Sequence, residues 1–157
     1  MEQPDDAWTR LWSAVNRHPA RVLAALVVLF LGITVYQAAT RLLWVDEILT
    51  LSIAQQGSAP GIWRALALGA DPNPPLIHLA VLLSTRLFGH AALAVRLPSI
   101  LGMLLAIVAL WTILRRWLLP GFAALGVLAL MTTRGFDYAY EARSYAPLTG
   151  FTMLAFA

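Results

Sequence analysis

The chain has 157 residues, of which 60% are apolar and only 12% charged, and its mean hydropathy is +0.73. Soluble domains are roughly half apolar and a quarter charged, so this composition excludes an ordinary soluble domain. All 11 basic residues are arginines and the net charge is +3. Arginines that flank membrane segments account for this charge without a nucleic-acid partner. The sequence has no cysteine, which excludes disulfides, thiolate metal sites and a thiol nucleophile.

Apolar runs predict an all-α, polytopic membrane fold, because a membrane-crossing helix needs about 20 apolar residues. The first run covers residues 22–40 and is preceded by Arg10, Arg17 and Arg21, which places residues 1–21 in the cytoplasm. Two further spans are expected at about 97–114 and 117–133, with a turn at Pro120-Gly121 between them.

A fourth run, residues 144–157, has only 14 residues and would leave a charged carboxylate inside the hydrocarbon. We therefore expect the chain to be the N-terminal part of a longer multi-pass protein. Residues 75–88 are apolar but contain His78 and Arg86. The count of arginines slightly favours a crossing there, whereas the short length and the polar interruptions favour an interfacial helix. The second interpretation, which we adopt, makes residues 41–96 one external loop with short amphipathic helices.

Polar residues are scarce in such a chain and mark candidate sites. Asp46 and Glu47 follow the first span directly. They are either a solvated acidic pair or carboxylates that can accept a proton from a hydroxyl or hold a divalent cation. His78 is a lone histidine, a type that is more often structural than catalytic. Glu141 and Arg143 lie in a tyrosine-rich segment, which suits either an interfacial aromatic belt or a phosphate-bearing lipid.

Four motifs follow one another in the chain: WVDEILT at 44–50, DPNPPL at 71–76, VRLPSILG at 95–102 and YEARSYA at 140–146. In this order and spacing they resemble the N-terminal part of GT-C-type polytopic glycosyltransferases. The similar branch contains the protein O-mannosyltransferases and the aminoarabinose lipid A transferases. The resemblance covers the chain from about residue 23 onward.

This resemblance implies a transferase of the plasma (inner) membrane that takes a sugar from a polyprenyl-phosphate donor on the external face. The acceptor would be a lipid, a glycan or a protein. Asp46 matches the family's catalytic carboxylate and has Glu47 beside it, while Arg96 and Arg143 fall in motifs that we expect near the donor phosphate. Asn73 stands where the family often has histidine or lysine before Pro-Pro, so we expect its amide, in place of a charged side chain, to donate a hydrogen bond to the donor phosphate.

The expected chemistry is direct attack with inversion, Asp46 being the general base. A hydrolase that pairs Asp46 with Glu141 is an alternative, and a metal bound by Asp46 and Glu47 is another possibility. A non-catalytic membrane subunit, part of a transporter, or an inactive fragment of such an enzyme are the competing classes.

Overall fold

The computed structural model describes residues 7–157 and is all-helical over that range. Residues 1–6 of the predicted cytoplasmic segment lie outside the described residues. The helices, in chain order, are α1 (Ala7–Arg17), α2 (Pro19–Thr40), α3 (Val45–Ala54), α4 (Ala59–Ala67), α5 (Pro75–Phe88), α6 (Ala92–Arg115), α7 (Pro120–Met131), the 3-10 helix η1 (Arg134–Tyr140) and α8 (Tyr145–Phe156).

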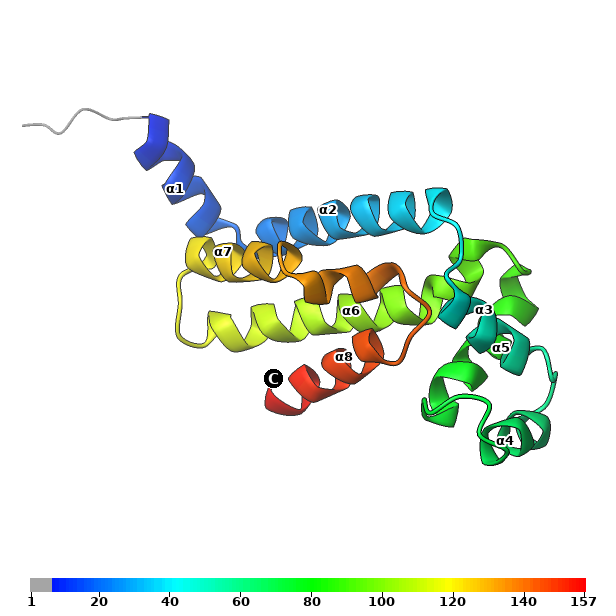
Figure 1. The fold of residues 1–157 in the computed structure, drawn as a ribbon. Helices are drawn as coiled ribbons and strands as arrows, with labels where there is room; N and C mark the ends of the chain where they lie inside the picture. Colours follow the sequence, from blue (N-terminus) through cyan, green and yellow to red (C-terminus); the bar gives the residue numbers. More distant parts are fainter. Residues whose placement is uncertain (1–6) are drawn as a thin grey trace, which may run out of the picture.

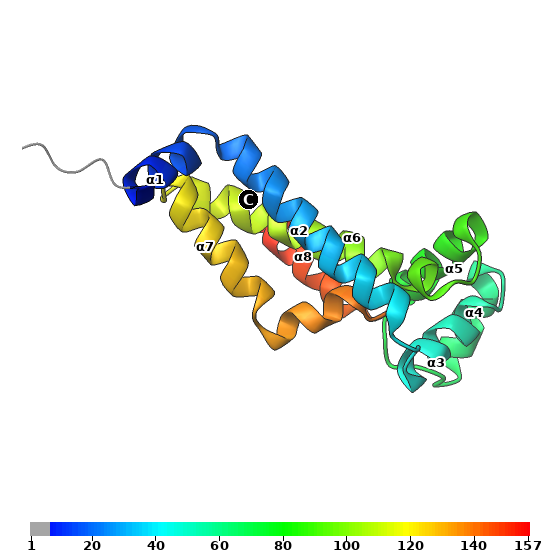
Figure 2. The same ribbon diagram turned by 90° about the horizontal axis from the view of Figure 1, so that it is seen from above.

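The long helix α6 is the centre of a four-helix bundle, and α2, α7 and α8 pack along it (Figures 1 and 2). The short helices α3, α4 and α5 gather at one end of this bundle, and α1 lies at the other end. The fold therefore separates two ends, one formed by the residues of the predicted external loop and one by the N-terminal helix.

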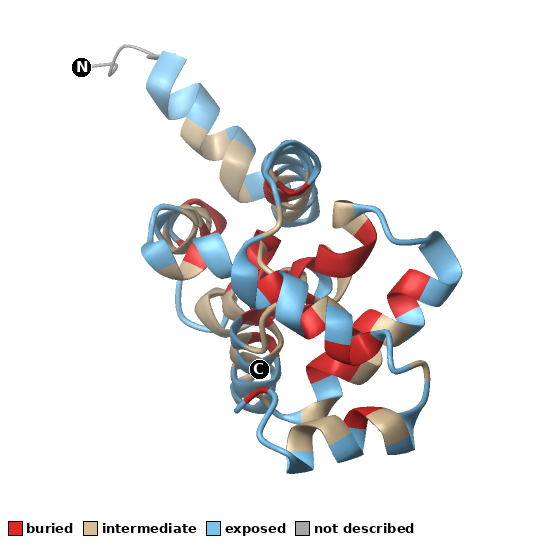
Figure 3. Ribbon diagram, turned by 45° about the vertical axis from the view of Figure 1, so that its right-hand side comes forward, coloured by how far each residue is buried: buried red, intermediate tan, exposed pale blue. Residues whose placement is uncertain are grey.

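The closest packing in the bundle is between α6 and α8, because glycines replace bulky side chains at the contact. A Cβ atom at Gly102 would come within 2.5 Å of the Pro147 backbone, and one at Gly150 would overlap the Gly102 carbonyl. Small residues of this kind let membrane helices approach closely. Buried side chains such as Phe30 and Ile107 fill the remaining core between α2, α6 and α7. Figure 3 shows the buried segments concentrated on the inward sides of the helices.

Two helices, Pro19–Thr40 and Ala92–Arg115, are long and apolar enough to cross a membrane, as judged by length and composition. They contain the predicted spans 22–40 and 97–114. The regions predicted at 117–133 and 144–157 form the helices Pro120–Met131 and Tyr145–Phe156, each of 12 residues. Residues 75–88 form a helix of 14 residues, and its depth in the membrane stays a prediction.

Two local expectations differ from the structure. Pro120 and Gly121 do not form the turn, because Pro120 is the first residue of α7, a position where its missing N–H costs nothing. The second long helix begins at Ala92 rather than near residue 97, so it contains Arg96 and Pro98. Pro98 leaves the Ala94 carbonyl without its helical donor, and the Ser84 hydroxyl donates to that carbonyl at 2.6 Å.

Candidate active site

A buried ion pair joins α3 to α6 where the bundle meets the short helices. Glu47 and Arg96 are each 1% exposed, and two parallel hydrogen bonds of 2.8 and 2.7 Å join their side chains. The backbone N–H of Trp44 donates to the Glu47 carboxylate at 3.0 Å and that of Ala142 at 2.9 Å. Burial by itself raises the pKa of Glu47, but the bonds from Arg96, Trp44 and Ala142 outweigh it and hold this pKa below its usual value.

Arg96 also closes the end of α2. Its guanidinium donates to the carbonyls of Ala38 at 2.8 Å, Arg41 at 2.9 Å and Leu42 at 2.9 Å. A helix ends with carbonyls that lack intrahelical donors. Arg96 supplies a donor to one of these, that of Ala38, and to two carbonyls just beyond the helix. With the two bonds to Glu47, all five N–H groups of the guanidinium are engaged. This geometry favours a positioning role for Arg96 over the predicted contact with the donor phosphate.

Next to this buried pair lies an ion pair at the surface. Arg143 donates to Asp46, whose side chain is 58% exposed, while the Arg143 side chain is 21% exposed. Within residues 7–157 the Arg143 guanidinium makes no other hydrogen bond, so it retains donors for a ligand. Asp46 and Glu47 are consecutive, as are Ala142 and Arg143, so the buried contacts set the position of the exposed ones.

Asn73 connects this site to the loop before α5. Its side-chain amide donates to Asp71 at 2.7 Å, and its carbonyl oxygen accepts a hydrogen bond from Ser144 at 2.8 Å. The predicted site residue Asn73 therefore lies beside the 141–144 segment, with one amide N–H still free for a ligand. Ser144 is a neighbour of Arg143 and gave no signal of its own in the sequence.

His78 is fully buried, with Nε2 3.7 Å from an Asp71 carboxylate oxygen. Burial lowers the pKa of His78, and the charge of Asp71 and the Thr50 backbone only partly oppose this effect. Asp71 lies between His78 and Asn73 and contacts both. His78 makes no hydrogen bond to the Asp46 carboxylate. It stays unassigned to the chemistry.

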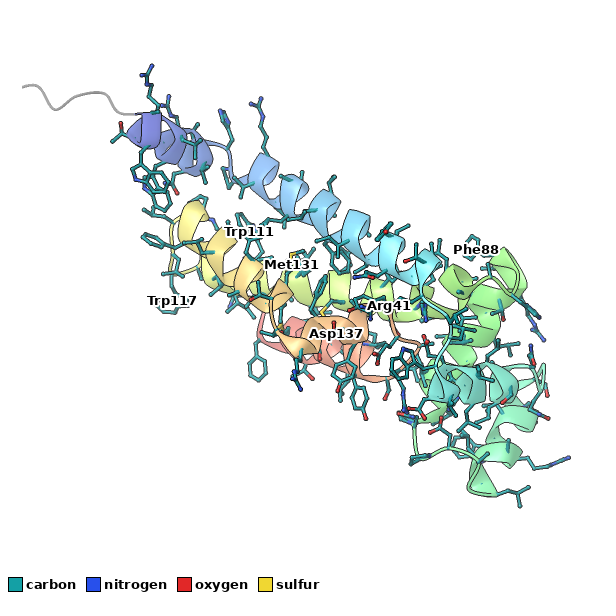
Figure 4. All side chains as sticks on the ribbon, turned by 45° about the horizontal axis from the view of Figure 1, so that its top comes forward. Arg41, Phe88, Trp111, Trp117, Met131 and Asp137 are labelled. Carbon is teal, nitrogen blue, oxygen red and sulfur yellow. The ribbon has the colours of Figure 1, made fainter. Side chains whose placement is uncertain are left out.

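Glu141 is half-buried between the ion pair and η1. Burial raises its pKa, and the nearby charges of Glu47 and Asp137 add to this effect. Tyr140 donates to Asp137, and burial together with this bond raises the pKa of Tyr140 to about 12. Arg41 lies over the Tyr140 ring, 4.8 Å from its centroid. Figure 4 labels Arg41, which follows the end of α2, and Asp137 in η1.

The donor groups do not fit a metal held jointly by Asp46 and Glu47. Both Glu47 oxygens already accept bonds from Arg96 and backbone N–H groups. In the part of the chain that the structure describes, no three His, Asp or Glu residues form a group that could hold a metal ion.

An apolar cavity of about 620 Å³ opens beside the site, between α5, α6 and α8. Its walls are mainly apolar, with leucine the most frequent residue (for example Leu83, Leu101 and Leu148), and Ser144 and Pro74 also line it. Because Ser144 lines this cavity and follows Arg143 directly, an apolar space lies next to the ion pair of Asp46 and Arg143.

Among the predicted site residues, the structure brings together Asp46, Glu47, Arg96, Arg143 and Asn73, and sets Glu141 beside them. The family resemblance had assigned Asp46, Arg96, Arg143 and Asn73 to one site around the sugar donor. The sequence could not predict that the backbone N–H of Ala142 and the carbonyls at the end of α2 take part in the site. Every residue has these backbone groups, so residue identity does not reveal which of them contribute.

A search of curated proteins and a search of solved structures each give no match. The family model described as dolichyl-phosphate-mannose-protein mannosyltransferase matches residues 72–156, which is more than half of the chain and includes two of the four motifs and all but the first residue of a third. The chain therefore belongs to the dolichyl-phosphate-mannose-protein mannosyltransferase family, a GT-C-type family of membrane glycosyltransferases.

Proposed function

We propose that this chain supplies the acceptor-activating part of a glycosyltransferase that uses a polyprenyl-phosphate-linked sugar. Family membership supports glycosyl transfer from such a donor. The observation that carries the assignment of Asp46 is its setting, an exposed carboxylate that a buried ion pair holds in place beside an arginine with free donors. A carboxylate fixed in this way is prepared for proton transfer without first having to be ordered.

In the proposed reaction an acceptor hydroxyl gives its proton to the Asp46 carboxylate. The hydroxyl oxygen forms a bond to the anomeric carbon while the bond from that carbon to the phosphate oxygen breaks, and the phosphate leaves with the electron pair. One direct displacement inverts the anomeric configuration. The step needs a base near the acceptor hydroxyl and positive charge near the leaving phosphate. The direct contact between Asp46 and Arg143 must therefore open for a sugar to bind between them.

Arg143 is the proposed source of that positive charge. Its free N–H groups match the oxygens of a phosphate, for which a guanidinium is well shaped. Asn73 can add one amide hydrogen bond. Arg96 does not contact the substrate in this proposal. Its bonds to Glu47 and to the end of α2 fix the position of the backbone at Asp46.

The polyprenyl chain of the donor would lie in the apolar cavity between α5, α6 and α8. Its leucine-rich walls suit an isoprenoid, and Ser144 places one wall next to Arg143. We further propose that the reaction takes place at the external face of the plasma membrane, with the N-terminus in the cytoplasm and a lipid, glycan or protein as acceptor.

The test is sugar transfer from a polyprenyl-phosphate donor in membranes that contain the full-length protein. Asp46→Asn keeps the size of the side chain and should lower turnover at least about a hundredfold, the usual scale for loss of a general base. Asp46→Glu should retain part of the activity. Asp137→Asn, which removes another exposed carboxylate, is the matched control and should leave transfer intact. Full turnover by Asp46→Asn would overturn the assignment.

A further inference from the structure

The end of the bundle opposite the candidate site carries a second surface, which the proposed reaction does not use. It consists of α1, the first turn of α2 and the turn between α6 and α7, which lie together in both views (Figures 1 and 2). We call the set Arg17, Arg21, Arg115 and Arg116 the basic end.

The helix α1 has a polar and an apolar side. Thr9, Ser13 and Arg17 follow at intervals of four along one side, whereas Trp8, Leu11, Trp12 and Val15 share the other. A short helix with this division and low overall hydrophobicity is typical of helices that lie in the membrane interface.

Only half of the apolar side is used to hold α1 in place. Trp12 packs edge-on against Phe122 with ring centroids 5.2 Å apart, and the Asn16 side chain accepts a hydrogen bond of 3.0 Å from the Gly121 N–H. A Cβ at Gly121 would come within 2.5 Å of the Trp12 ring, so the glycine is needed for this contact. α1 is therefore docked on the first turn of α7 and has a fixed place at the bundle end.

The other half of the apolar side remains uncovered. Trp8 is 69% exposed and Leu11 59% exposed, and Trp117, in the turn after α6, is 85% exposed. Figure 4 labels Trp117 at the same end of the molecule as α1. Exposed tryptophans at the end of a helix bundle are characteristic of the level of the lipid headgroups, and the opposite end also has two, Trp44 and Trp63.

The charged residues that the structure describes at this end are all basic. Between residues 7 and 45 and between residues 97 and 136 the sequence has no aspartate or glutamate. The acidic residues Glu2, Asp5 and Asp6 lie outside the described residues. Arg17, Arg21 and Arg116 are exposed and Arg115 is half-buried.

We propose that the basic end and the free side of α1 together bind the headgroups of acidic phospholipids, with Trp8 and Leu11 inserted at the boundary of the acyl chains. Two separate segments supply the arginines, so the site is a property of the folded end and not of one basic sequence. Clusters of basic residues near a membrane bind acidic lipid headgroups. The apolar side chains beside these arginines match the acyl-chain region that lies below the headgroups.

The test compares the association of spin-labelled phosphatidylglycerol and phosphatidylcholine with the full-length protein in bilayers at low salt. We expect a preference for phosphatidylglycerol that Arg17→Gln/Arg21→Gln and Arg115→Gln/Arg116→Gln each reduce several-fold, the upper scale being about fivefold per arginine. The control is Arg64→Gln/Arg134→Gln, two exposed arginines on other elements, and it should keep the preference. Absence of a preference, an effect of only one of the two pairs, or an equal effect of the control would overturn the composite site.

A second measurement tests the placement of α1 independently of affinity. Because the chain has no cysteine, single nitroxide labels can be placed by Leu11→Cys and Ser13→Cys. In bilayers that contain phosphatidylglycerol, the label at position 11 should be accessible to oxygen and shielded from a water-soluble nickel chelate, with the opposite result at position 13. Equal exposure of both labels to the nickel chelate would contradict insertion.

Discussion

Replacing Arg96 by methionine should be one of the most destabilising single substitutions in this chain. Methionine keeps an unbranched side chain, is shorter than arginine and removes every donor. The substitution leaves the Glu47 carboxylate, which is 1% exposed, without its charged partner. It also leaves the Ala38 carbonyl without a donor at a buried position.

The structure sets the size of the effect. Removing one partner of a buried ion pair costs about 3–5 kcal/mol, because the remaining charge is neither solvated nor neutralised. The bonds from Arg96 to the carbonyls of Arg41 and Leu42 are only partly buried. Water can replace them, so their loss adds nothing to the expected change in the free energy of unfolding. The expected loss lowers the folding equilibrium constant about a hundredfold to a few thousandfold.

The assay is unfolding of the full-length protein in mixed micelles, with Glu47→Gln, Arg96→Met and the double variant compared. If an uncompensated buried charge is the main cost, adding Glu47→Gln to Arg96→Met should recover about 1 kcal/mol or more, although it removes a further native group. A loss below about 1 kcal/mol for Arg96→Met, or a double variant less stable than Arg96→Met alone, would refute this reasoning.

Three further outcomes follow from the packing and from the pKa shifts. Because the folded pKa of Glu47 is lowered, its contribution to stability is complete above the ordinary value of 4.5 and is lost as the pH falls through the folded pKa; Glu47→Gln should remove this part of acid unfolding, which a pH series of melting temperatures would measure. The folded pKa of His78 is also lowered, so the protein should lose stability as the pH falls below 6.5, and His78→Phe should flatten the same series in that range. Gly102→Leu should separate α6 from α8 and cost at least about 3 kcal/mol, since its Cβ alone would meet the Pro147 backbone; wild-type stability of this variant would show that the close approach is wrong.

Much of the fold could be predicted because membrane segments are long and almost free of charge. The runs at 22–40 and 97–114 fall inside helices of 22 and 24 residues. The start of α6 could not be located, because Arg96 and Pro98 interrupt the apolar pattern that defines a span. Arg96 is accommodated only because Glu47, 49 residues earlier, neutralises it, and such a pairing depends on tertiary structure.

The candidate site was predictable at the level of residue types and order. Asp46 and Arg143 were expected to converge, and they form an ion pair. The different roles of Arg96, which positions the backbone, and Arg143, which keeps donors for a ligand, were not predictable. Both are arginines in matching motifs. Burial separates them, because one has every donor engaged by the protein and the other keeps donors free.

The most direct test of the account exchanges the charges of the surface pair in the variant Asp46→Arg/Arg143→Asp. Both variants with one substitution should lose stability and sugar transfer. The double variant restores opposite charges and should recover the unfolding midpoint, but it should not transfer sugar, because the base and the phosphate-binding group have changed places. Recovery of transfer together with stability would show that the pair is only structural, and would contradict the role of Asp46 as the base.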